Sequence, residues 1–219
     1  MKAIITVLLL LSSLFSLPVL ATEQTDMKLI LDKNGIKIWS YRLPDSPFHG
    51  FKAVTTVKST LSGVVALITD TESANRWLYR TNEVVALSQD DENFVVRVVT
   101  EFPWPFKNRE AVVAGKITQD PQNLFVRIES SSVANHAVRA GYERMPKVEG
   151  GWLFRPLGHG QVEVTMTGHA ELGGYVPAAI VNLLIQEHPY NSLLGLKKVI
   201  GETRFQTARL NTVREPVVN

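Results

Sequence analysis

Gln161-Val-Glu-Val-Thr-Met-Thr-Gly-His-Ala-Glu-Leu172 is the most regular element of this 219-residue chain. Apolar or small residues alternate with polar ones along its whole length. Successive side chains of a strand point to opposite faces, so the pattern predicts a strand with one buried and one solvated face. The apolar face comprises Val162, Val164, Met166, Gly168, Ala170 and Leu172. Because Gly168 and Ala170 are small, this face either packs closely against a helix or leaves room for a ligand.

A long helix is predicted after this strand, from Pro177 to Arg209. Pro177 suits the first turn of a helix, and Pro189 removes one backbone hydrogen bond, so we expect it to kink or split the helix. Unbroken, the helix would be about 50 Å long, enough to cross a sheet. Its apolar stripe is expected to contain Ala179, Ile180, Leu183 and Leu184, continued by Leu193, Leu196 and Ile200.

Short periodic runs bounded by Gly, Pro, Asn and Asp precede the strand and predict further strands. These runs are Ile36–Leu43, Phe51–Ser59, Glu83–Ser88, Phe94–Phe102, Glu110–Thr118, Leu124–Ser131 and Gly151–Pro156. A helix is predicted from Leu61 to about Tyr79, with Thr60 as its N-cap. Short turns such as Gly158-His159-Gly160 favour antiparallel connections. The predicted fold class is α+β, with one antiparallel sheet beside a long C-terminal helix.

Glu101-Phe-Pro-Trp-Pro-Phe-Lys-Asn-Arg109 interrupts this pattern with three aromatic residues. Two prolines remove backbone donors and fix two φ angles, so we expect a stiff, extended loop. Two interpretations remain open for Phe102, Trp104 and Phe106. They fold back onto the core of the protein, or they border a cavity or a lipid surface.

This loop resembles the central motif of START domains, the steroidogenic-acute-regulatory-related lipid-transfer family. The resemblance rests on Phe-Pro-Trp-Pro at 102–105, followed by Asn108-Arg109 and Ala111-Val112-Val113. Other family-like segments occur in the same order, and the similarity runs from about Asn34 to about Ile200. These segments are Asn34-Gly35-Ile36-Lys37-Ile38, Phe51-Lys52-Ala53 and Val176-Pro177-Ala178-Ala179-Ile180-Val181-Asn182.

The resemblance implies a helix-grip (START or Bet v 1-like) fold. In this fold a curved antiparallel sheet wraps around the long C-terminal helix and encloses an internal hydrophobic cavity. In sterol-carrying members a buried acid and a buried Arg are thought to meet the ligand. Matching by order places Val98 and Gly115 there, beside Arg97 and Lys116, so the charged pair is not reproduced. The expected ligand-binding residues are Phe102, Trp104, Phe106, Arg109, Val164, Met166, Gly168, Ala170, Ala179, Ile180, Leu183 and Leu184.

Arg109 closes the aromatic loop where a strand resumes, and its role has several interpretations. It could form an ion pair with Glu101 or Glu110, which contributes little to stability if exposed. Alternatively, its guanidinium bonds carbonyl groups that the prolines leave without partners, or it meets a polar lipid head group.

The N-terminus has the composition of a secretory signal. Met1-Lys2 precedes an apolar run from Ala3 to Leu17, and we expect cleavage after Ala21. This run is shorter than the ~20 residues that a membrane span needs. The chain has no cysteine, so neither disulfides nor a lipoprotein anchor are expected. We therefore predict a single lipid-binding domain at 22–210, a tail at 211–219, and location in the periplasm of a Gram-negative bacterium, or secretion.

Composition and motifs argue against several classes of function. The formal net charge of +2 falls to +1 without Lys2, too little for a nucleic-acid footprint. There is no Gly-x-Ser-x-Gly elbow and no thiol. None of the five histidines forms an HxH or HExxH pair. His169 and Glu171 share a strand face, but that face is the polar one, so we expect both to be solvated. We predict no catalytic residue, cofactor or metal.

Three functions remain open from the sequence. The first is a monomeric, non-enzymatic carrier that binds one lipid or other hydrophobic molecule and contacts membranes transiently. The second is a cyclase- or hydrolase-like enzyme with the same cavity, for which Arg109, His136, Tyr142 and Glu143 are the polar candidates. The third is an envelope interaction module whose loop aromatics dock onto a membrane or a partner.

Overall fold

The computed structural model describes residues 27–217, and the predicted signal peptide lies outside this range. A ten-stranded sheet dominates the fold, in the order β1-β2-β3-β10-β9-β7-β6-β5-β4, with β8 paired to β6. The strands are β1 (Lys28–Lys33), β2 (Ile36–Arg42), β3 (His49–Lys58), β4 (Thr81–Gln89), β5 (Asn93–Thr100), β6 (Arg109–Gln119), β7 (Val126–Ser132), β8 (Glu143–Arg144), β9 (Lys147–Gly158) and β10 (Gln161–Glu171). The pairs are antiparallel except β6–β8. This confirms the predicted fold class.

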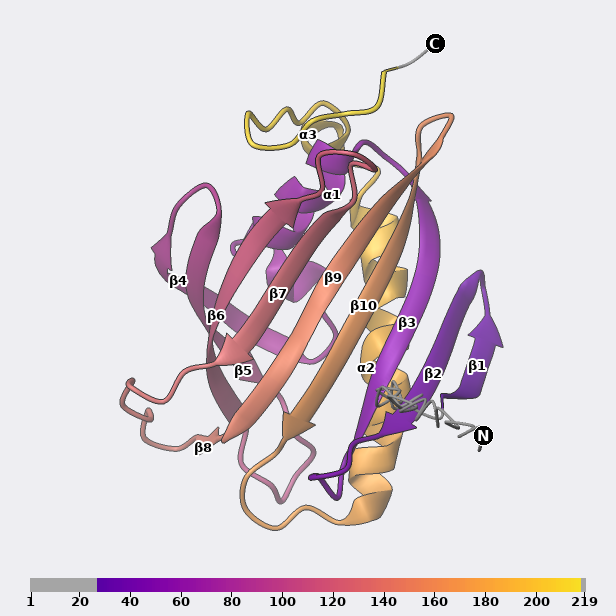
Figure 1. Cartoon of the computed structure of the whole chain (residues 1–219). Coiled ribbons are helices and arrows are strands. Elements are labelled where there is room, and N and C mark those ends of the chain that lie inside the picture. The colour runs from indigo at the N-terminus through magenta and orange to yellow at the C-terminus, as the bar shows by residue number, and fades with distance from the viewer. Residues whose placement is uncertain (1–26, 218–219) are drawn as a thin grey trace, which may run out of the picture.

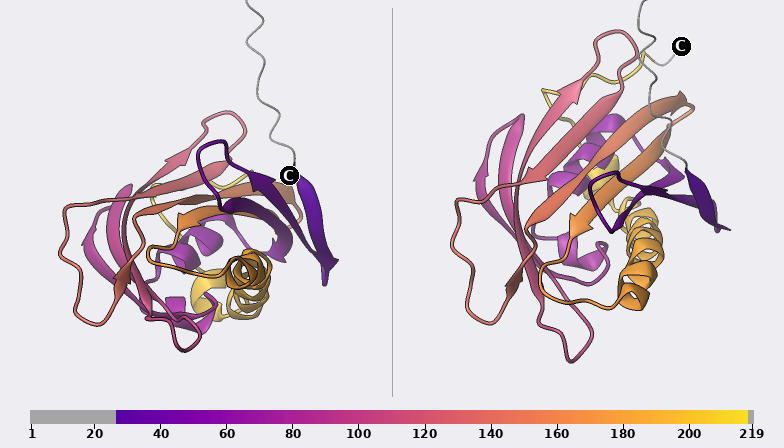
Figure 2. Two further views of the ribbon diagram at one scale, coloured as in Figure 1. Left: turned by 90° about the horizontal axis from the view of Figure 1, so that it is seen from below. Right: turned by 60° about the horizontal axis from the view of Figure 1, so that its bottom comes forward.

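The sheet curves around its longest helix (Figures 1 and 2). The helical elements are α1 (Leu61–Thr69), the short 3-10 helix η1 (Ala74–Arg76), α2 (Ala178–Val199) and α3 (Thr203–Gln206). Helix α2 runs along the concave face, and its contacts with the sheet are concentrated on β3 and β2. On the side of β4, β5 and β6, the sheet bends away from α2 (Figure 2). The predicted helix-grip arrangement is therefore present.

β10 lies in the middle of the sheet, as its regular alternation predicts. It pairs with β3 on one side and with β9 on the other, so it joins the N-terminal and C-terminal parts of the chain. β9 begins four residues earlier than expected, at Lys147, because its polar first residues pair with the end of β10, where Glu171 lies opposite Lys147. β1 was not predicted from the sequence.

The first helix is shorter than the prediction of Leu61 to Tyr79. Thr60 is the N-cap as predicted, since its hydroxyl accepts a hydrogen bond from the Gly63 amide at 3.0 Å. The helix ends at Thr69 because Asp70 takes an extended conformation. Its carboxylate accepts hydrogen bonds from the amide and hydroxyl of Ser73, which closes a turn in place of another helical turn.

The C-terminal helix is not split at Pro189, contrary to one of the two expectations for this residue. α2 remains one helix from Ala178 to Val199 with Pro189 inside it. The proline removes a single backbone hydrogen bond, whereas Leu193 and Leu196 are completely buried beyond it. The helix ends at Val199 rather than at Arg209, and the chain then turns into α3.

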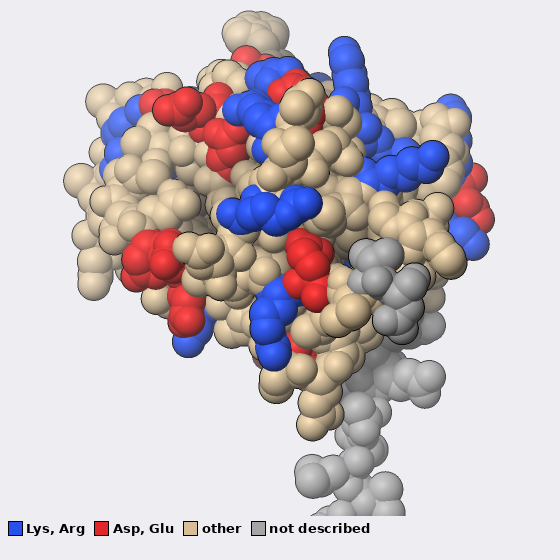
Figure 3. Space-filling model, turned by 90° about the horizontal axis from the view of Figure 1, so that it is seen from above, with Lys and Arg blue, Asp and Glu red and all other residues tan. Residues whose placement is uncertain are grey.

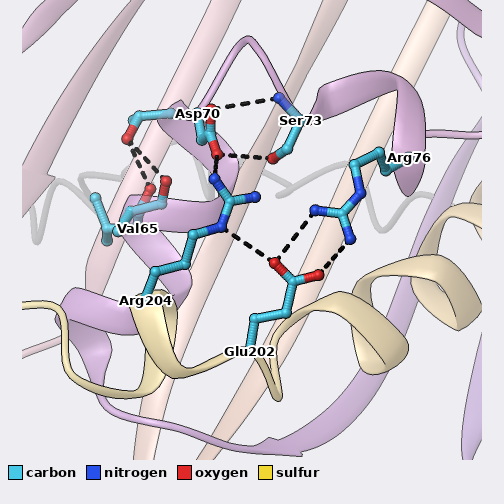
Figure 4. A network of polar contacts seen from close by, with 8 residues as sticks. Val65, Asp70, Ser73, Arg76, Glu202 and Arg204 are labelled. Atoms are coloured by element: carbon cyan, nitrogen blue, oxygen red, sulfur yellow. Dashed lines mark hydrogen bonds and ion pairs between the residues drawn. The ribbon is translucent and has the colours of Figure 1, made fainter.

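One end of the molecule is held together by ion pairs between α1, η1 and α3 (Figure 4). The Glu202 carboxylate accepts hydrogen bonds from Arg76 and from Arg204 Nε. Arg204 Nη1 also donates to Asp70 Oδ2 at 2.9 Å. Seen from this end, positive and negative side chains are interspersed on the surface (Figure 3).

The C-terminal residues return to the same end. The Glu215 carboxylate accepts hydrogen bonds from the Leu61 and Ser62 amides at 3.0 and 2.7 Å. A carboxylate is favourable there because the first amides of a helix lack intrahelical partners. The last described residues therefore close the first turn of α1. No helix within residues 27–217 is long and apolar enough to cross a membrane.

Candidate functional site

A cavity of about 340 Å³ lies between the concave face of the sheet and α2. Its wall combines strands from both halves of the sheet with η1 and α2. The volume is near the lower limit of ligand pockets, which range over roughly 300–1,000 Å³. Two hydrophobic clusters surround this region, one toward α1 and α3 and one at the N-terminal end of α2.

A row of small residues crosses four strands at the floor of the cavity and ends in a phenyl ring on each side; Gly115 lies beneath the Phe94 ring, and the other members of the row border the cavity. Cross-strand pairing places these residues side by side, in the order Phe51, Gly168, Gly150, Ser130, Gly115 and Phe94. A Cβ atom on Gly168 would lie within 2.8 Å of two atoms of the Phe51 ring. The close packing expected against a helix is instead made with the Phe51 ring of the neighbouring strand β3, and the glycine also borders the cavity, as the second interpretation expected.

The opposite wall is one face of α2, formed by Val181, Leu184, Ile185 and His188. From Val181 to His188 this face extends for about 10 Å along the helix. The sequence predicted an apolar stripe of Ala179, Ile180, Leu183 and Leu184. This stripe is centred on a face of α2 next to the one that borders the cavity. Continuing the spacing from Leu184 by four residues would have reached His188, but the prediction followed apolar residues only.

Large side chains close the cavity at the end toward α1. Met166, Trp152 and Ile128 form the next row of the sheet, and Trp77 contacts Trp152 edge to face at a centroid distance of 5.8 Å. All four residues border the cavity. We call this part of the wall the closed end.

The other end of the cavity, the loop end, is formed by Phe102, Met145, Leu172 and Val181. These residues belong to one buried cluster. They come from the 101–109 loop, the end of β8, and the chain that enters α2. Figure 1 shows the 101–109 loop and the chain that enters α2 at the end of the molecule opposite α1 and α3.

The 101–109 loop turns back on itself, whereas the sequence predicted an extended loop. The Phe106 amide donates to the Pro103 carbonyl at 3.0 Å, and Asn108 Oδ1 accepts from the Phe102 amide at 3.1 Å. These bonds supply partners for backbone groups that extended backbone would leave to solvent. As a result the three aromatics separate. Phe102 borders the cavity, Phe106 packs on the same cluster without bordering the cavity, and Trp104 is 92% exposed.

Arg109 fixes this loop to the chain that enters α2. Its side chain is buried, and its guanidinium donates to the carbonyl oxygens of Lys107, Leu172 and Gly173. Its Cζ also lies 4.2 Å from the centroid of the Phe102 ring. Burial lowers the pKa of Arg109, and the charge of Glu143 partly opposes this effect. No ion pair forms with Glu101 or Glu110. Arg109 bonds carbonyl groups, as one interpretation expected, but only that of Lys107 belongs to the proline-containing loop, and those of Leu172 and Gly173 belong to the chain that enters α2.

The residues predicted to bind ligand divide into three groups. Phe102, Met166, Gly168, Ala170 and Leu184 border the cavity. Arg109 and Phe106 pack behind its wall, Val164 is fully buried in the larger cluster, and Trp104 and Ile180 lie outside the lining. The side chains of Ala179 and Leu183 are outside the described part of the structure. Ligand binding by these residues stays a prediction.

Several cavity residues were missed because no pattern in one strand distinguishes them. Val96 and Val98 on β5 and Ala111 and Val113 on β6 border the cavity. Their alternation could have indicated the inward face, but not that this face is hollow. The charged residues next to them, Arg97 and Lys116, point to the outer face of the sheet. Arg97 Nε lies 3.7 Å from Glu110, and Lys116 Nζ lies 3.9 Å from Glu92.

Glu110 is a buried carboxylate on the outward side of β6. Burial opposes its ionisation, but hydrogen bonds from Arg144 and from the Arg139 amide, with the charges of Arg144 and Arg97, hold its pKa below the ordinary value. Its partners on β5, on β8 and in the chain before β8 link the strands behind the cavity wall.

His169 is buried, whereas the sequence predicted a solvated side chain. It is 5% exposed, and neither ring nitrogen has a hydrogen-bond partner among residues 27–217. It alternates with Gly168 and Ala170, so its side chain lies on the outer face of the sheet, where a groove also contacts Tyr41 and Glu149. No group of three or more metal-ligating side chains occurs in the described range.

The START domain model matches residues 23–197 of the chain. The chain belongs to the START family. An uncharacterized protein of Pseudomonas aeruginosa is 26% identical to this START protein over 172 residues, which are 78% of this chain and 85% of that protein.

Solved START structures have the same fold. A STAR-related lipid transfer protein from Xanthomonas axonopodis has a TM-score of 0.74 at 24% identity, and the match covers 80% of this chain and 99% of that one. Human StAR-related lipid transfer protein 5 has a TM-score of 0.73 at 16% identity, with 82% and 88% covered. Proteins with the START fold typically bind hydrophobic ligands.

Proposed function

We propose that this START protein binds one hydrophobic molecule in the cavity and carries or sequesters it in the cell envelope without chemical change. The apolar lining of the cavity is the main support for this proposal. Its wall is built mainly from Val, Phe, Leu, Ile, Met and Trp side chains and from backbone atoms. Burying a sixteen-carbon chain at ~0.8 kcal/mol per CH₂ would gain roughly 12 kcal/mol. Association costs ~4 to 15 kcal/mol, so net affinity is modest, which suits a carrier that must release its ligand.

The two ends of the molecule suggest where the ligand enters. The closed end lies beneath the ion pairs of Arg76, Glu202 and Arg204 and the packed Trp77 and Trp152 rings. The loop end is joined chiefly by Arg109 and a small hydrophobic cluster. We therefore propose that the 101–109 loop and the first turns of α2 separate to admit the ligand.

An enzymatic function has less support from the geometry. It would require polar groups that converge inside the cavity. Of the four candidates, neither Arg109, His136, Tyr142 nor Glu143 borders the cavity. Glu143 lies in β8, and the Tyr142 ring instead stacks against Arg139, with its centroid 4.7 Å from Cζ.

Native mass spectrometry of protein purified from a lipid-containing host tests the proposal, together with transfer of labelled lipid between vesicles. We expect one bound hydrophobic molecule per chain and measurable transfer. Ala170→Trp should abolish both, because it fills the cavity from β10. Glu171→Trp, on the next and outward-facing position, is the matched control and should retain both. Wild-type protein that never carries or extracts lipid would contradict the proposal.

We also propose export to the periplasm, on the basis of the N-terminal sequence. Cell fractionation and N-terminal sequencing of the native protein test this location. A mature chain that starts at Thr22 in the periplasmic fraction is expected, whereas an uncut chain in the cytoplasm would contradict it.

A further inference from the structure

His188 is a polar residue in an otherwise apolar face of α2. It shares this face with Val181, Leu184 and Ile185, and all four border the cavity. Burial lowers the pKa of His188 to about 4, so the imidazole is neutral at neutral pH. The side chain is nonetheless partly exposed. Since His188 is one of the residues that line the cavity, its exposed part faces the cavity.

The imidazole has unused hydrogen-bonding capacity. A neutral imidazole offers one N–H donor and one acceptor nitrogen. No hydrogen bond to its side chain is found among residues 27–217. The nearest titratable neighbour on α2, Glu187, is directed instead to the Tyr79 hydroxyl, which donates to it at 3.3 Å. A ligand in the cavity is therefore the available partner for His188.

Two further polar atoms without partners occur in the same wall. Trp77 Nε1 and Thr81 Oγ1 are buried, have no hydrogen-bond partner in the described part of the chain, and belong to residues that border the cavity. The 77–81 segment follows α2 closely, because the Tyr79 amide donates to Ser192 Oγ at 3.0 Å. Ser192 lies one turn beyond His188, on the same side of the helix. Buried polar groups are normally satisfied, so both residues are candidate partners for a polar ligand group, although neither atom is itself exposed to the cavity.

We call the region of His188, Trp77 and Thr81 the polar corner of the cavity. Of the described residues that line the cavity, none with a charged side chain faces this corner. Glu149 is the one charged residue among those bordering the cavity within residues 27–217. It alternates with the inward-facing Val148 and Gly150, and its carboxylate pairs with Lys147 Nζ at 3.5 Å. His49, the other inward-facing histidine, lies at the opposite end of the cavity, since β3 begins there. A charged ligand head would thus be buried without a counter-charge, which is costly.

We propose that the ligand is an uncharged, single-chain amphiphile whose one hydroxyl or carbonyl group hydrogen-bonds His188 on the α2 wall, with its chain in the apolar part of the cavity. This rests on the proposed carrier function. Trp77 and Thr81 are the candidates for the second hydrogen bond that such a group can make. The volume of about 340 Å³ agrees with one chain rather than two.

Three ligands that differ only in their head group test this inference. Dodecan-1-ol, dodecane and dodecanoate are each offered to the purified, delipidated protein at pH 7.5, and bound complexes are quantified by native mass spectrometry. We expect the alcohol to bind about tenfold more tightly than the alkane, since one net hydrogen bond corresponds to roughly that factor. Dodecanoate should bind at least tenfold more weakly than the alcohol.

Variants at His188 assign the effect to one side chain. In His188→Leu, alcohol affinity should fall about tenfold to the level of the alkane, while alkane affinity changes less than about twofold. In His188→Asn, which keeps a donor and an acceptor, part of the preference for the alcohol should return. His159→Asn, in the exposed β9–β10 turn, is the control, and thermal melting identifies any variant that fails to fold.

The outcomes separate this inference from the proposed function. Equal binding of alcohol and alkane by wild type, or a preference for the alcohol that persists in His188→Leu, would overturn the role of His188 and leave the carrier function intact. Tighter binding of dodecanoate would overturn the uncharged class of ligand. Failure to bind any of the three, or vesicle lipid, would count against both proposals.

Discussion

Arg109 and His188 are two basic residues beside the cavity. Arg109 is charged, whereas His188 is neutral. Arg109 keeps its charge because three carbonyl oxygens and the face of Phe102 surround the guanidinium. His188 has no such partners in the described residues, and burial alone lowers its pKa to about 4. The first residue therefore holds the loop end together, whereas the second is a neutral polar group available to a ligand.

Replacing Arg109 tests the first of these roles. In Arg109→Lys the planar guanidinium is lost, and a single ammonium nitrogen cannot reach the three carbonyl groups that the guanidinium nitrogens contact. We expect the free energy of unfolding to fall by about 1.5–3 kcal/mol, measured by urea denaturation. Arg42→Lys, at an exposed site without a side-chain hydrogen bond, should change it by less than about 0.5 kcal/mol. Equal effects of the two variants would contradict the role of Arg109.

The pKa of His188 predicts a pH dependence of stability. Between pH 6.5 and about 4 the unfolded chain binds a proton at this residue and the folded chain does not. Stability therefore falls as pH drops through this window and levels off below the folded pKa, by at most about 3 kcal/mol. His188→Phe should remove this slope. The comparison is made by denaturation at pH 7 and pH 5, since Glu110 and other carboxylates with lowered pKa values contribute mainly at lower pH. An unchanged slope would show that His188 is solvated.

At the scale of elements, the cavity exists because four adjacent strands carry small residues at the same level. Gly168, Gly150, Ser130 and Gly115 align only through the register of β10, β9, β7 and β6. Large residues one row away, such as Trp152 and Met166, limit the space toward α1. The depth of the cavity is thus a property of strand register rather than of any one strand.

Gly115→Ala tests the contribution of this floor. An added Cβ would lie 2.1 Å from the Phe94 ring, so the ring must move into the cavity. We expect a loss of about 1–3 kcal/mol in stability and less co-purified lipid by native mass spectrometry. Gly201→Ala, whose Cβ would meet nothing closer than Lys198 O at 3.9 Å, is the matched control. Unchanged lipid content in Gly115→Ala would mean that this row does not limit the cavity.

At the scale of the whole molecule, the two ends of the barrel-like sheet differ in how they are held. Ion pairs and the Glu215 carboxylate join α1, η1 and α3 at one end. At the other end, Trp104 and Tyr175 project from loops that meet at Arg109, with 92% and 85% of their surfaces exposed. Exposed aromatics on adjoining loops are suited to a membrane interface.

Trp104→Ala should separate membrane contact from folding. Because Trp104 is exposed, we expect its loss to change stability by less than about 0.5 kcal/mol, while the rate of lipid transfer between vesicles falls several-fold. Leu157→Ala removes another exposed apolar side chain, from the last residues of β9. The turn between β9 and β10 that follows lies at the end of the molecule opposite the 101–109 loop (Figure 1). Leu157→Ala should leave transfer unchanged. Equal transfer rates for wild type and Trp104→Ala would remove this loop from the mechanism.

The sequence alone determined the fold class, because its signals are local. The alternation from Gln161 to Leu172, the Thr60 cap and the family-like loop each depend on residues within one element, and each has its counterpart in the structure. Local signals were also wrong where a distant contact decides. The loop was predicted to be extended, yet Asn108 closes it, and Arg109 had several open roles until Leu172 and Gly173 were seen beside it.

The cavity and its polar corner were decided only by the tertiary structure. An inward-facing valine has the same sequence pattern whether its partner is a side chain or empty space. Hollowness depends on which residues of β6, β7, β9 and β10 align and on which face α2 presents to them. His188 looked like one of five unremarkable histidines, because the burial that makes it neutral comes from strands and helices far away in the chain.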